Sequence, residues 1–424
     1  MRRGSWRWHG EALETMKFER MDRKFETLAL WATVGVFFAF PVMMAVANVA
    51  MALVLVLWLF AGAFPDRWKE IRHNPVAVAA LALYGVIAFG ALYSPAPSSD
   101  ILLHLEKYAK LLIAVVLMSL LVQPEWPRRC MQAFVWAMGF ILASTWLSVW
   151  WEVPWSNTHT RGFGVSHHVF GDYITQNVMM AFFALLALLR AWHAPRWSGR
   201  TAWGAVALLA SVSITHLSDG RTGYLLLAVV VVVFALTALK GRVAWLTLIL
   251  ATALMLLALF SSGHMRDRFT LAVEEAQRVD QDRFTSIGNR VYLYKTVPAL
   301  IAQKPLLGHG TGAYHGEICR MASTEQGCHI WVKWHPHNQF LFFAADHGAL
   351  GLMAYLALLG SLLWRAGRTT DPQTRVLLIG LTGLLVADSM VNSPLWSGRE
   401  SHFFVYMMAL LACKANFEDQ NASK

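Results

Sequence analysis

Apolar runs long enough to cross a bilayer recur along most of this 424-residue sequence. A transmembrane helix needs about 20 apolar residues, because each residue advances the helix by only about 1.5 Å. Hydrophobic residues make up 56% of the chain and charged residues only 15%, against about 25% charged residues in soluble domains. The sequence therefore predicts an all-α, polytopic membrane protein with about 12 transmembrane helices. The expected spans are residues 27–44, 46–64, 75–93, 106–122, 130–151, 172–192, 201–217, 222–239, 243–260, 338–363, 374–391 and 401–416.

These runs divide the chain into five parts. We predict a cytoplasmic N-terminal tail over 1–26, transmembrane helices 1–9 over 27–260, a large periplasmic loop over 261–337, transmembrane helices 10–12 over 338–416, and a cytoplasmic tail over 417–424. The first tail is polar and basic, and no small-residue cleavage site follows a short apolar core. The first two spans are barely separated, so one bent hairpin is an alternative.

The distribution of Lys and Arg predicts the orientation in the membrane. With the N-terminus in the cytoplasm, about 22 of the 36 basic residues fall in the inner segments, as the positive-inside rule requires. The long loop then faces the periplasm, and the protein lies in the inner membrane. The net charge of +10 does not indicate nucleic-acid binding, because the positive charge lies mainly in short loops. The short outer loops and span ends hold Lys107, Lys110, Arg161, Arg221 and Arg399.

Three arginines on the predicted outer side are candidates for an anion site. Arg161 lies in an outer loop, Arg221 lies between two spans in Asp219-Gly220-Arg221-Thr222-Gly223, and Arg290 lies in the long loop. Charged residues at the membrane are costly, so each is a functional candidate. Arginine offers paired hydrogen bonds in a fixed fork, which suits a diphosphate. The alternative is that each arginine snorkels at the interface or pairs with a nearby acid.

The run His335-Pro336-His337-Asn338 closes the long loop and opens a span. Asn338 can cap the following helix, and Pro336 restricts the backbone before it. A histidine at this position could move a proton near neutral pH or donate a hydrogen bond to an anion. A polar cap with no chemical role is the simpler interpretation of the same residues.

No metal site is expected. The histidines and cysteines show no zinc-ligand spacing, and Asp100, Asp219 and Asp388 are isolated. The pairs Glu274–Glu275 and Asp280–Asp282 lie among basic residues, which is typical of a solvated helix face. We therefore expect arginines, and no cofactor, to supply the positive charge. Cys319 and Cys328 lie in the outer loop and form a disulfide candidate if that compartment is oxidising.

Together these motifs resemble the O-antigen ligase and polymerase superfamily. The resemblance rests on Gly288-Asn289-Arg290, Tyr292, Pro298, Pro305, Gly308-His309-Gly310-Thr311-Gly312 and His335-Pro336-His337-Asn338, together with Arg161 and Arg221-Thr222-Gly223. It implies a lipid-carrier glycosyltransferase of the GT-C-like type. Such an enzyme moves a glycan from undecaprenyl diphosphate, in the periplasm, to an acceptor. In the ligases the acceptor is a sugar hydroxyl of lipid A–core, and the length and modest loop of this chain favour a ligase.

Site roles follow from this resemblance and from the chemistry of glycosyl transfer. Arg221 and Arg290 are cast as catalytic diphosphate ligands, and Arg161 as a further one, because fixed cations stabilise the leaving group. His337 is cast as the base, or as the group that orients the acceptor hydroxyl. A single displacement would invert the anomeric centre. The supporting substrate-binding candidates are His335, Asn338 and Tyr292.

Three alternatives remain. An O-antigen polymerase or a protein O-oligosaccharyltransferase would use the same chemistry with another acceptor. A transporter of a lipid-linked sugar would only bind the same lipid. Transporters tend to have inverted repeats and broken helices at the midplane, and the sequence shows no such symmetry.

Overall fold

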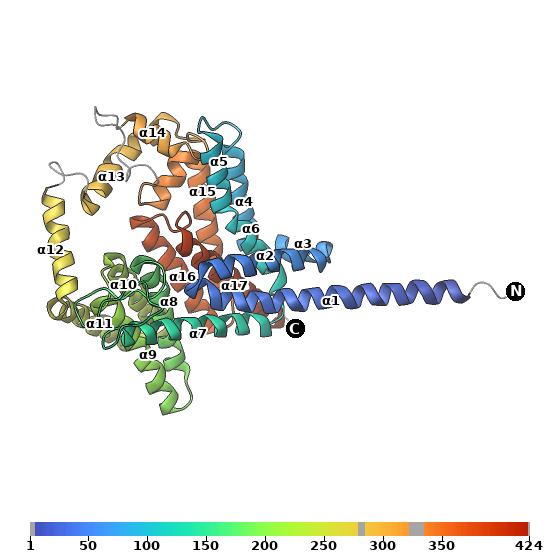
Figure 1. Ribbon diagram of the computed structural model, residues 1–424, viewed down its shortest axis with the longest axis horizontal. Helices are drawn as coiled ribbons and strands as arrows, with labels where there is room; N and C mark the ends of the chain where they lie inside the picture. Colours follow the sequence, from blue (N-terminus) through green and yellow to red (C-terminus); the bar gives the residue numbers. More distant parts are fainter. Residues whose placement is uncertain (1–4, 279–284, 322–334, 423–424) are drawn as a thin grey trace.

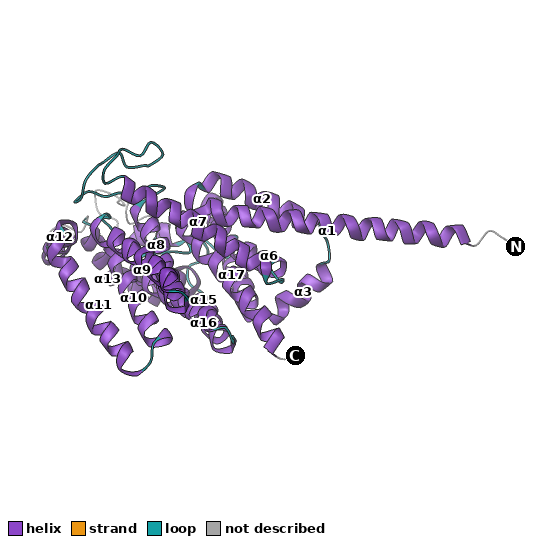
Figure 2. Ribbon diagram, turned by 90° about the horizontal axis from the view of Figure 1, so that it is seen from below, coloured by secondary structure: helices purple, strands orange, loops and turns teal. Residues whose placement is uncertain are grey.

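The computed structural model describes residues 5–278, 285–321 and 335–422, and within these ranges the chain is helical and has no strand (Figure 1, Figure 2). The predicted all-α class is confirmed for these residues. The helices are α1 (Ser5–Val42), α2 (Met44–Phe60), α3 (Phe64–His73), α4 (Pro75–Gly90), α5 (Ser98–Tyr108), α6 (Lys110–Leu120), α7 (Glu125–Leu147), α8 (Tyr173–His193), α9 (Trp197–His216), α10 (Arg221–Ala238), α11 (Gly241–Ser261), α12 (Gly263–Gln277), α13 (Ser286–Gln303), α14 (Tyr314–Met321), α15 (Gln339–Arg368), α16 (Pro372–Val391) and α17 (Gly398–Ala422).

Seven of the described helices are long and apolar enough to cross a membrane, or up to eight if the bent pair α2–α3 counts as one span. The seven are Arg23–Val42 of α1, together with α7, α8, α10, α11, α15 and α16. Several apolar spans in one chain make this a multi-pass membrane protein. The full count of 12 spans stays a prediction.

The chain bends at places that the apolar pattern did not mark. The predicted span 46–64 ends at Phe60, and α3 leaves at 116° to α2. Gly62 and Ala63 have φ of 61° and 57°, which lie outside helical backbone space and break the helix. The predicted span 106–122 is divided between α5 and α6. The predicted N-terminal tail and first span are instead continuous in α1, and α2 packs back along α1 as a hairpin.

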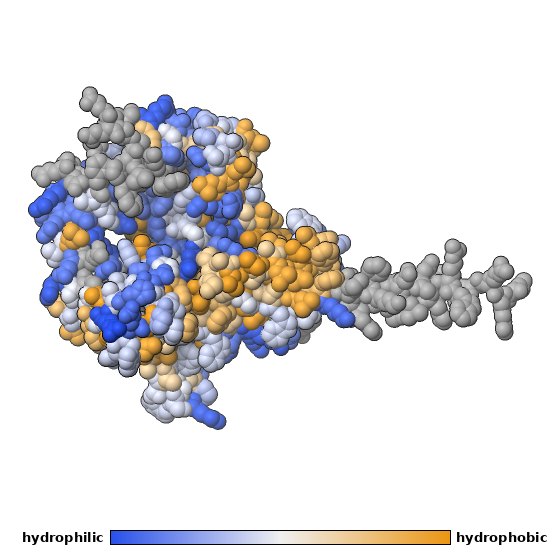
Figure 3. Space-filling model, viewed as in Figure 1, coloured by the Kyte–Doolittle hydropathy of each residue, from blue (hydrophilic) through white to orange (hydrophobic). Residues whose placement is uncertain are grey.

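Apolar side chains cover much of the outer surface. Only 6% of the α11 span window is buried within the protein, although α11 has the highest hydropathy of the seven spans. Along α2, Val49 is 73% exposed and Phe60 is 63% exposed. Figure 3 shows apolar surface gathered over α2. A patch of this kind is unfavourable in water, so lipid is its expected environment.

The core is built around α8 and α15. Side chains on all sides of α8 between Thr175 and Leu189 are buried, because α8 packs against α9, α10 and α16. Helix α15 packs against α4 and α16. Two core helices therefore connect the ends of the protein, and both begin close to the candidate site described below.

A glycine-rich loop over 305–312 fills a break in α15. Gly348 has φ 60° and ψ −153°, so the helix is interrupted there. The loop satisfies the freed backbone groups: His309 N donates to Ala345 O at 3.0 Å, and Ala349 N donates to Pro305 O at 2.8 Å. The Asp346 carboxylate accepts from Tyr314 N at 2.8 Å. These bonds fix the C-terminal end of α13 against α15.

We expect Gly308→Ala to destabilise the fold strongly. A Cβ at Gly308 would lie 2.4 Å from His347 N, and the residue has φ +71°. Overpacking against backbone and a left-handed φ together should cost about 2–4 kcal/mol of unfolding free energy. Gly316→Ala is the matched control, because nothing lies within 4 Å of its Cβ position and Ala favours the helix. Unfolding in mixed detergent micelles measures both, and equal stability of the two variants would contradict the role assigned to the loop.

Candidate active site

Arg290 lies in the second turn of α13, and that helix start is tied to α12. Thr285 caps α13 by accepting from Gly288 N at 3.0 Å. The Glu275 carboxylate accepts from Ile287 N at 3.1 Å. The positive end of the α13 dipole and the Arg290 guanidinium therefore lie in the same region.

Arg221 is the first residue of α10, and it meets the same glutamate. Its Nη1 lies 3.3 Å from Glu275 Oε2, and the side chains are 23% and 11% exposed. The expectation that Glu274 and Glu275 form a solvated helix face is therefore wrong for Glu275, although Glu274 is exposed. The sequence of α12 alone cannot distinguish Glu275 from Glu274, because Arg221, the partner of Glu275, lies 54 residues away in sequence.

The start of α10 is held close to α8. A Cβ at Gly223 would lie only 2.7 Å from Asn177 Nδ2. That amide nitrogen donates to Ser218 Oγ at 2.8 Å, and Asn177 is buried. The glycine in Arg221-Thr222-Gly223 thus permits the close packing that positions Arg221.

The charges of Arg221 and Arg290 repel one another. Burial, together with the positive charge of Arg221, lowers the pKa of Arg290, while Asp388 acts in the opposite direction. Among the described residues, Arg290 Nε and both Asp388 carboxylate oxygens are buried without a hydrogen-bond partner. Buried polar groups are normally paired, so unused donors beside a second cation suit an anion with several oxygens.

His335 and His337 form the second half of the site, immediately before α15. Their ring centroids are 4.3 Å apart, and His337 N donates to His335 Nδ1 at 3.2 Å. Asn338 caps α15 by accepting from Leu341 N at 3.0 Å, as the sequence predicted. His337 has φ 52°, an uncommon left-handed conformation for a residue with a side chain.

Contacts from two other helices hold this strained segment. The Tyr294 hydroxyl on α13 lies 3.1 Å from the His337 carbonyl and also contacts the Met390 carbonyl at the end of α16. Asn338 Nδ2 donates to Met390 O at 3.3 Å. The backbone conformation of His337 is therefore imposed by its surroundings, which is common at functional sites.

The surroundings of both histidines favour the neutral imidazole. Burial, with a further contribution from the Arg290 charge, lowers the pKa of His337 to about 4. Burial also lowers the pKa of His335 well below its ordinary value, with His337, Lys107 and Arg290 adding to the effect. A bound anion would oppose the Arg290 charge and raise both pKa values. His337 can thus accept a proton more readily once an anion is bound.

Among the described contacts, two predicted residues have partners outside this cluster. Arg161 is 59% exposed and pairs with Glu152 at 3.1 Å, and in the described part of the chain no contact joins it to Arg221 or Arg290. Tyr292 lies near Tyr314. Tyr294, two residues on, is the tyrosine that contacts the His337 backbone.

Four residues of the site were not predicted: Glu275, Tyr294, Asp388 and Lys107. Lys107 lies near His335, and its Nζ is 4.2 Å from the Trp396 ring centre. Asp388 carried one usable signal, since a carboxylate within an apolar span is a functional candidate. Lys107 carried the same signal, because it lies at the start of the predicted span 106–122. Glu275 and Tyr294 look like ordinary residues of a polar loop.

The cysteine prediction falls partly outside the described residues. Cys319 lies in α14 and is disulfide-bonded. Its predicted partner, Cys328, is not among the described residues, so the pairing stays a prediction. Cys130 and Cys413 are free and buried.

An apolar groove of about 440 Å³ lies between α9, α10 and α11. Leu208, Leu254 and Leu257 are among its lining residues. At one end the lining becomes polar, where His216 Nε2 lies 3.1 Å from Ser261 Oγ. Helix α10 begins at Arg221, five residues after His216, so the polar end of the groove is close in sequence to Arg221.

The segment that carries most of this site also matches a protein family. Residues 206–356 match the family model described as O-antigen ligase. The resemblance noted in the sequence is thereby confirmed. The match includes Arg221, Arg290, His335 and His337, whereas Arg161 lies outside it. No curated protein matches the chain. The matched segment covers less than half of the chain.

Proposed function

We propose that this chain is an O-antigen ligase that transfers a glycan from undecaprenyl diphosphate to a sugar hydroxyl of lipid A–core at the periplasmic face of the inner membrane. The observation that carries the proposal is the cluster of Arg221, Arg290, His335 and His337 at the N-terminal ends of three helices. Two neighbouring cations, one of them with an unpaired buried donor, suit a diphosphate leaving group, and an adjacent neutral histidine suits a proton acceptor. The membrane location fits a donor and an acceptor that are both lipids.

The reaction requires one displacement. The acceptor oxygen forms a bond to the anomeric carbon while the bond from that carbon to the diphosphate oxygen breaks, with inversion. The hydroxyl proton passes to His337, and the bonding electrons leave with the diphosphate, whose added charge Arg221 and Arg290 stabilise. Arg161 is retained as a further diphosphate ligand that would have to leave Glu152. Tyr292 is retained as a substrate-binding residue.

The apolar groove gives the lipid tail of the donor a place to lie. Its polar end is close in sequence to Arg221, so a diphosphate at the arginines could extend its polyprenyl chain along α9, α10 and α11. Such burial stabilises the complex in proportion to the apolar surface covered, although lipid tails compete for the same groove. We propose that the reaction needs no divalent metal, and activity retained in EDTA would test this.

We expect purified protein to transfer glycan to lipid A–core when both lipids are supplied in detergent. Mass spectrometry should detect lipid A–core that carries the glycan, together with free undecaprenyl diphosphate. A parallel reaction without lipid A–core is the control. If the donor glycan grows longer there instead, the chain is a polymerase. If no glycosidic bond is cleaved in either reaction, the enzymatic proposal fails and a transporter of the lipid becomes the better account.

We also expect the segment between α11 and α15 to face the periplasm. Thr270→Cys, on an exposed position of α12, should react with a membrane-impermeant maleimide in intact spheroplasts. Ser198→Cys, an exposed residue at the start of α9, is the matched control and should react only after the inner membrane is permeabilised. The native pair Cys319 and Cys328 is replaced by serine in both. The reverse labelling pattern would overturn the proposed orientation.

A further inference from the structure

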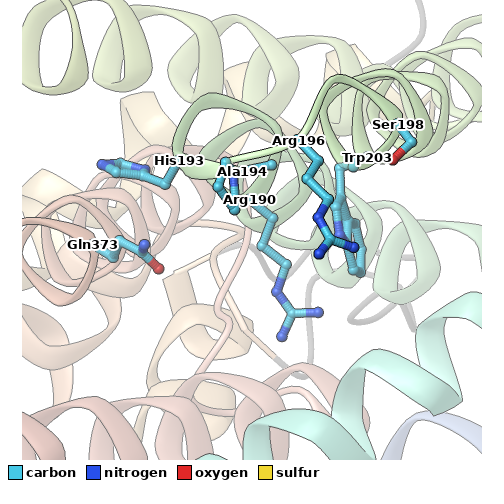
Figure 4. A pocket seen from close by; sticks show the side chains of 9 residues that line it. Arg190, His193, Ala194, Arg196, Ser198, Trp203 and Gln373 are labelled. Carbon is cyan, nitrogen blue, oxygen red and sulfur yellow. The ribbon is translucent and has the colours of Figure 1, made fainter.

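A basic pocket of about 590 Å³ lies where the end of α8 meets the starts of α9 and α16 (Figure 4). Its walls include Arg190 and His193 from the end of α8, Arg196 and Ser198 from the start of α9, and Gln373 from the start of α16. Helix α8 starts at Tyr173, near Arg290, and its 21 residues span roughly 30 Å. The pocket and the transfer site therefore lie at opposite faces of the membrane.

The two arginines in this pocket have unused hydrogen-bond donors. Arg190 is half-buried, and its guanidinium lies 4.6 Å from the centre of the Trp203 ring. In the described ranges no carboxylate lies within ion-pair distance of Arg190 or Arg196. Figure 4 shows both side chains extending in the same direction. A stacked, partly desolvated guanidinium without an acid partner is well suited to a phosphate group.

Further donors come from the start of α9. Arg196 is the N-cap residue there, and no side chain caps the helix. The free backbone N–H groups and the positive end of the helix dipole add to the two guanidiniums. The pocket thus combines two fixed positive charges with backbone donors. Arginines whose only role is to set the orientation of the protein in the membrane would not need to share a cavity.

The level of the pocket in the membrane indicates where the phosphate comes from. Trp192 is 50% exposed and Trp197 is 77% exposed, and they lie at the two helix ends that form the pocket. Exposed tryptophans of this kind gather at the headgroup level of a bilayer. A phosphate at this level belongs to a lipid rather than to the aqueous phase.

We propose that this pocket binds the phosphate of an anionic phospholipid in the leaflet opposite the transfer site. The guanidiniums of Arg190 and Arg196 contact the phosphate oxygens. The lipid tails lie along the exposed surface of α9, and Gln373 brings α16 to the same headgroup. A lipid held there would connect the end of α8 with the starts of α9 and α16.

Native mass spectrometry of the full chain with dioleoyl phosphatidylglycerol tests the proposal. We expect Arg190→Gln/Arg196→Gln to weaken retention of this lipid about 25-fold, because each arginine at a membrane surface contributes about a fivefold preference for anionic lipid. Arg196→Gln alone changes only an exposed side chain and should give about a fivefold loss. Arg129→Gln is the matched control, since Arg129 stacks on Trp31 and Trp126 away from the pocket.

The alternatives give different results. Equal retention by the double variant and by Arg129→Gln would overturn the proposal, as would equal retention of phosphatidylcholine and phosphatidylglycerol by the native protein. Displacement of the lipid by millimolar inorganic phosphate would show a site for free phosphate and contradict the lipid assignment. Glycan transfer measured on the same samples is a separate readout. Loss of lipid retention with unchanged transfer supports this pocket independently of the proposed reaction.

Discussion

Arg290→Lys is expected to lower the rate of glycan transfer by about 10²–10³-fold. Lysine keeps the positive charge but loses the forked pair of donors, and its strongly hydrated ammonium is less stable in a buried position. Arg290 Nε is buried without a partner among the described residues, so the guanidinium has donors available for the leaving group. Donor-lipid affinity should fall as well, because the same contacts form in the ground state. Transfer and lipid binding are measured on purified protein.

Arg266→Lys is the matched control for this substitution. Arg266 is exposed on the neighbouring helix α12, so the same exchange should leave transfer within about twofold of the native rate. Full activity of Arg290→Lys would show that a simple point charge is sufficient there. The proposal that Arg290 holds the diphosphate through paired hydrogen bonds would then be wrong.

His337→Gln is expected to remove turnover while donor binding stays near the native value. A general base contributes about 10²–10⁴-fold, and it acts mainly in the transition state. Glutamine can still donate a hydrogen bond, but it cannot take the proton from the acceptor hydroxyl. His73→Gln, at an exposed position on α3, is the control and should leave both quantities unchanged.

The pH profile of the native enzyme gives a second readout of the same role. A base must be neutral, so activity is lost as the pH falls through its pKa. The pKa of His337 is about 4 in the unliganded protein, and the acid limb of kcat/KM should lie near that value. Bound diphosphate opposes the Arg290 charge, so the acid limb of kcat should lie at higher pH. If the acid limbs of kcat and kcat/KM coincide, donor binding does not change the pKa of His337.

The sequence predicted those parts of the fold that depend on local pattern. Apolar runs located α8, α10, α11 and α16 closely, because a span must be apolar along its whole length. The cap at Asn338 was also predictable, since a cap needs only one side chain and the helix that follows it. The break of α15 at Gly348 was not predictable, because the Pro305–Leu306 segment that pairs with the freed backbone groups lies about forty residues earlier.

The candidate site was predicted only in part, because the sequence marks single residues but not the long-range contacts between them. Arg221, Arg290 and His337 stood out because each departs from the membrane pattern around it. Their meeting depends on long-range contacts, such as Glu275 bridging the starts of α10 and α13. Glu275 lies in a charged segment whose other described charged side chains are exposed, and no local feature distinguishes it. Arg161 had the same local signal as the other arginines, yet it pairs with Glu152 instead.

The most direct test of the proposed site measures donor-lipid affinity and single-turnover transfer rate in the same preparations of native protein, Arg290→Lys and His337→Gln. We expect the arginine variant to lose both quantities and the histidine variant to lose only the rate. If His337→Gln loses donor binding as fully as Arg290→Lys does, His337 is a phosphate ligand and not the base. If Arg290→Lys retains the full rate and the native affinity, the arginine cluster is not the diphosphate site, and the central claim is contradicted.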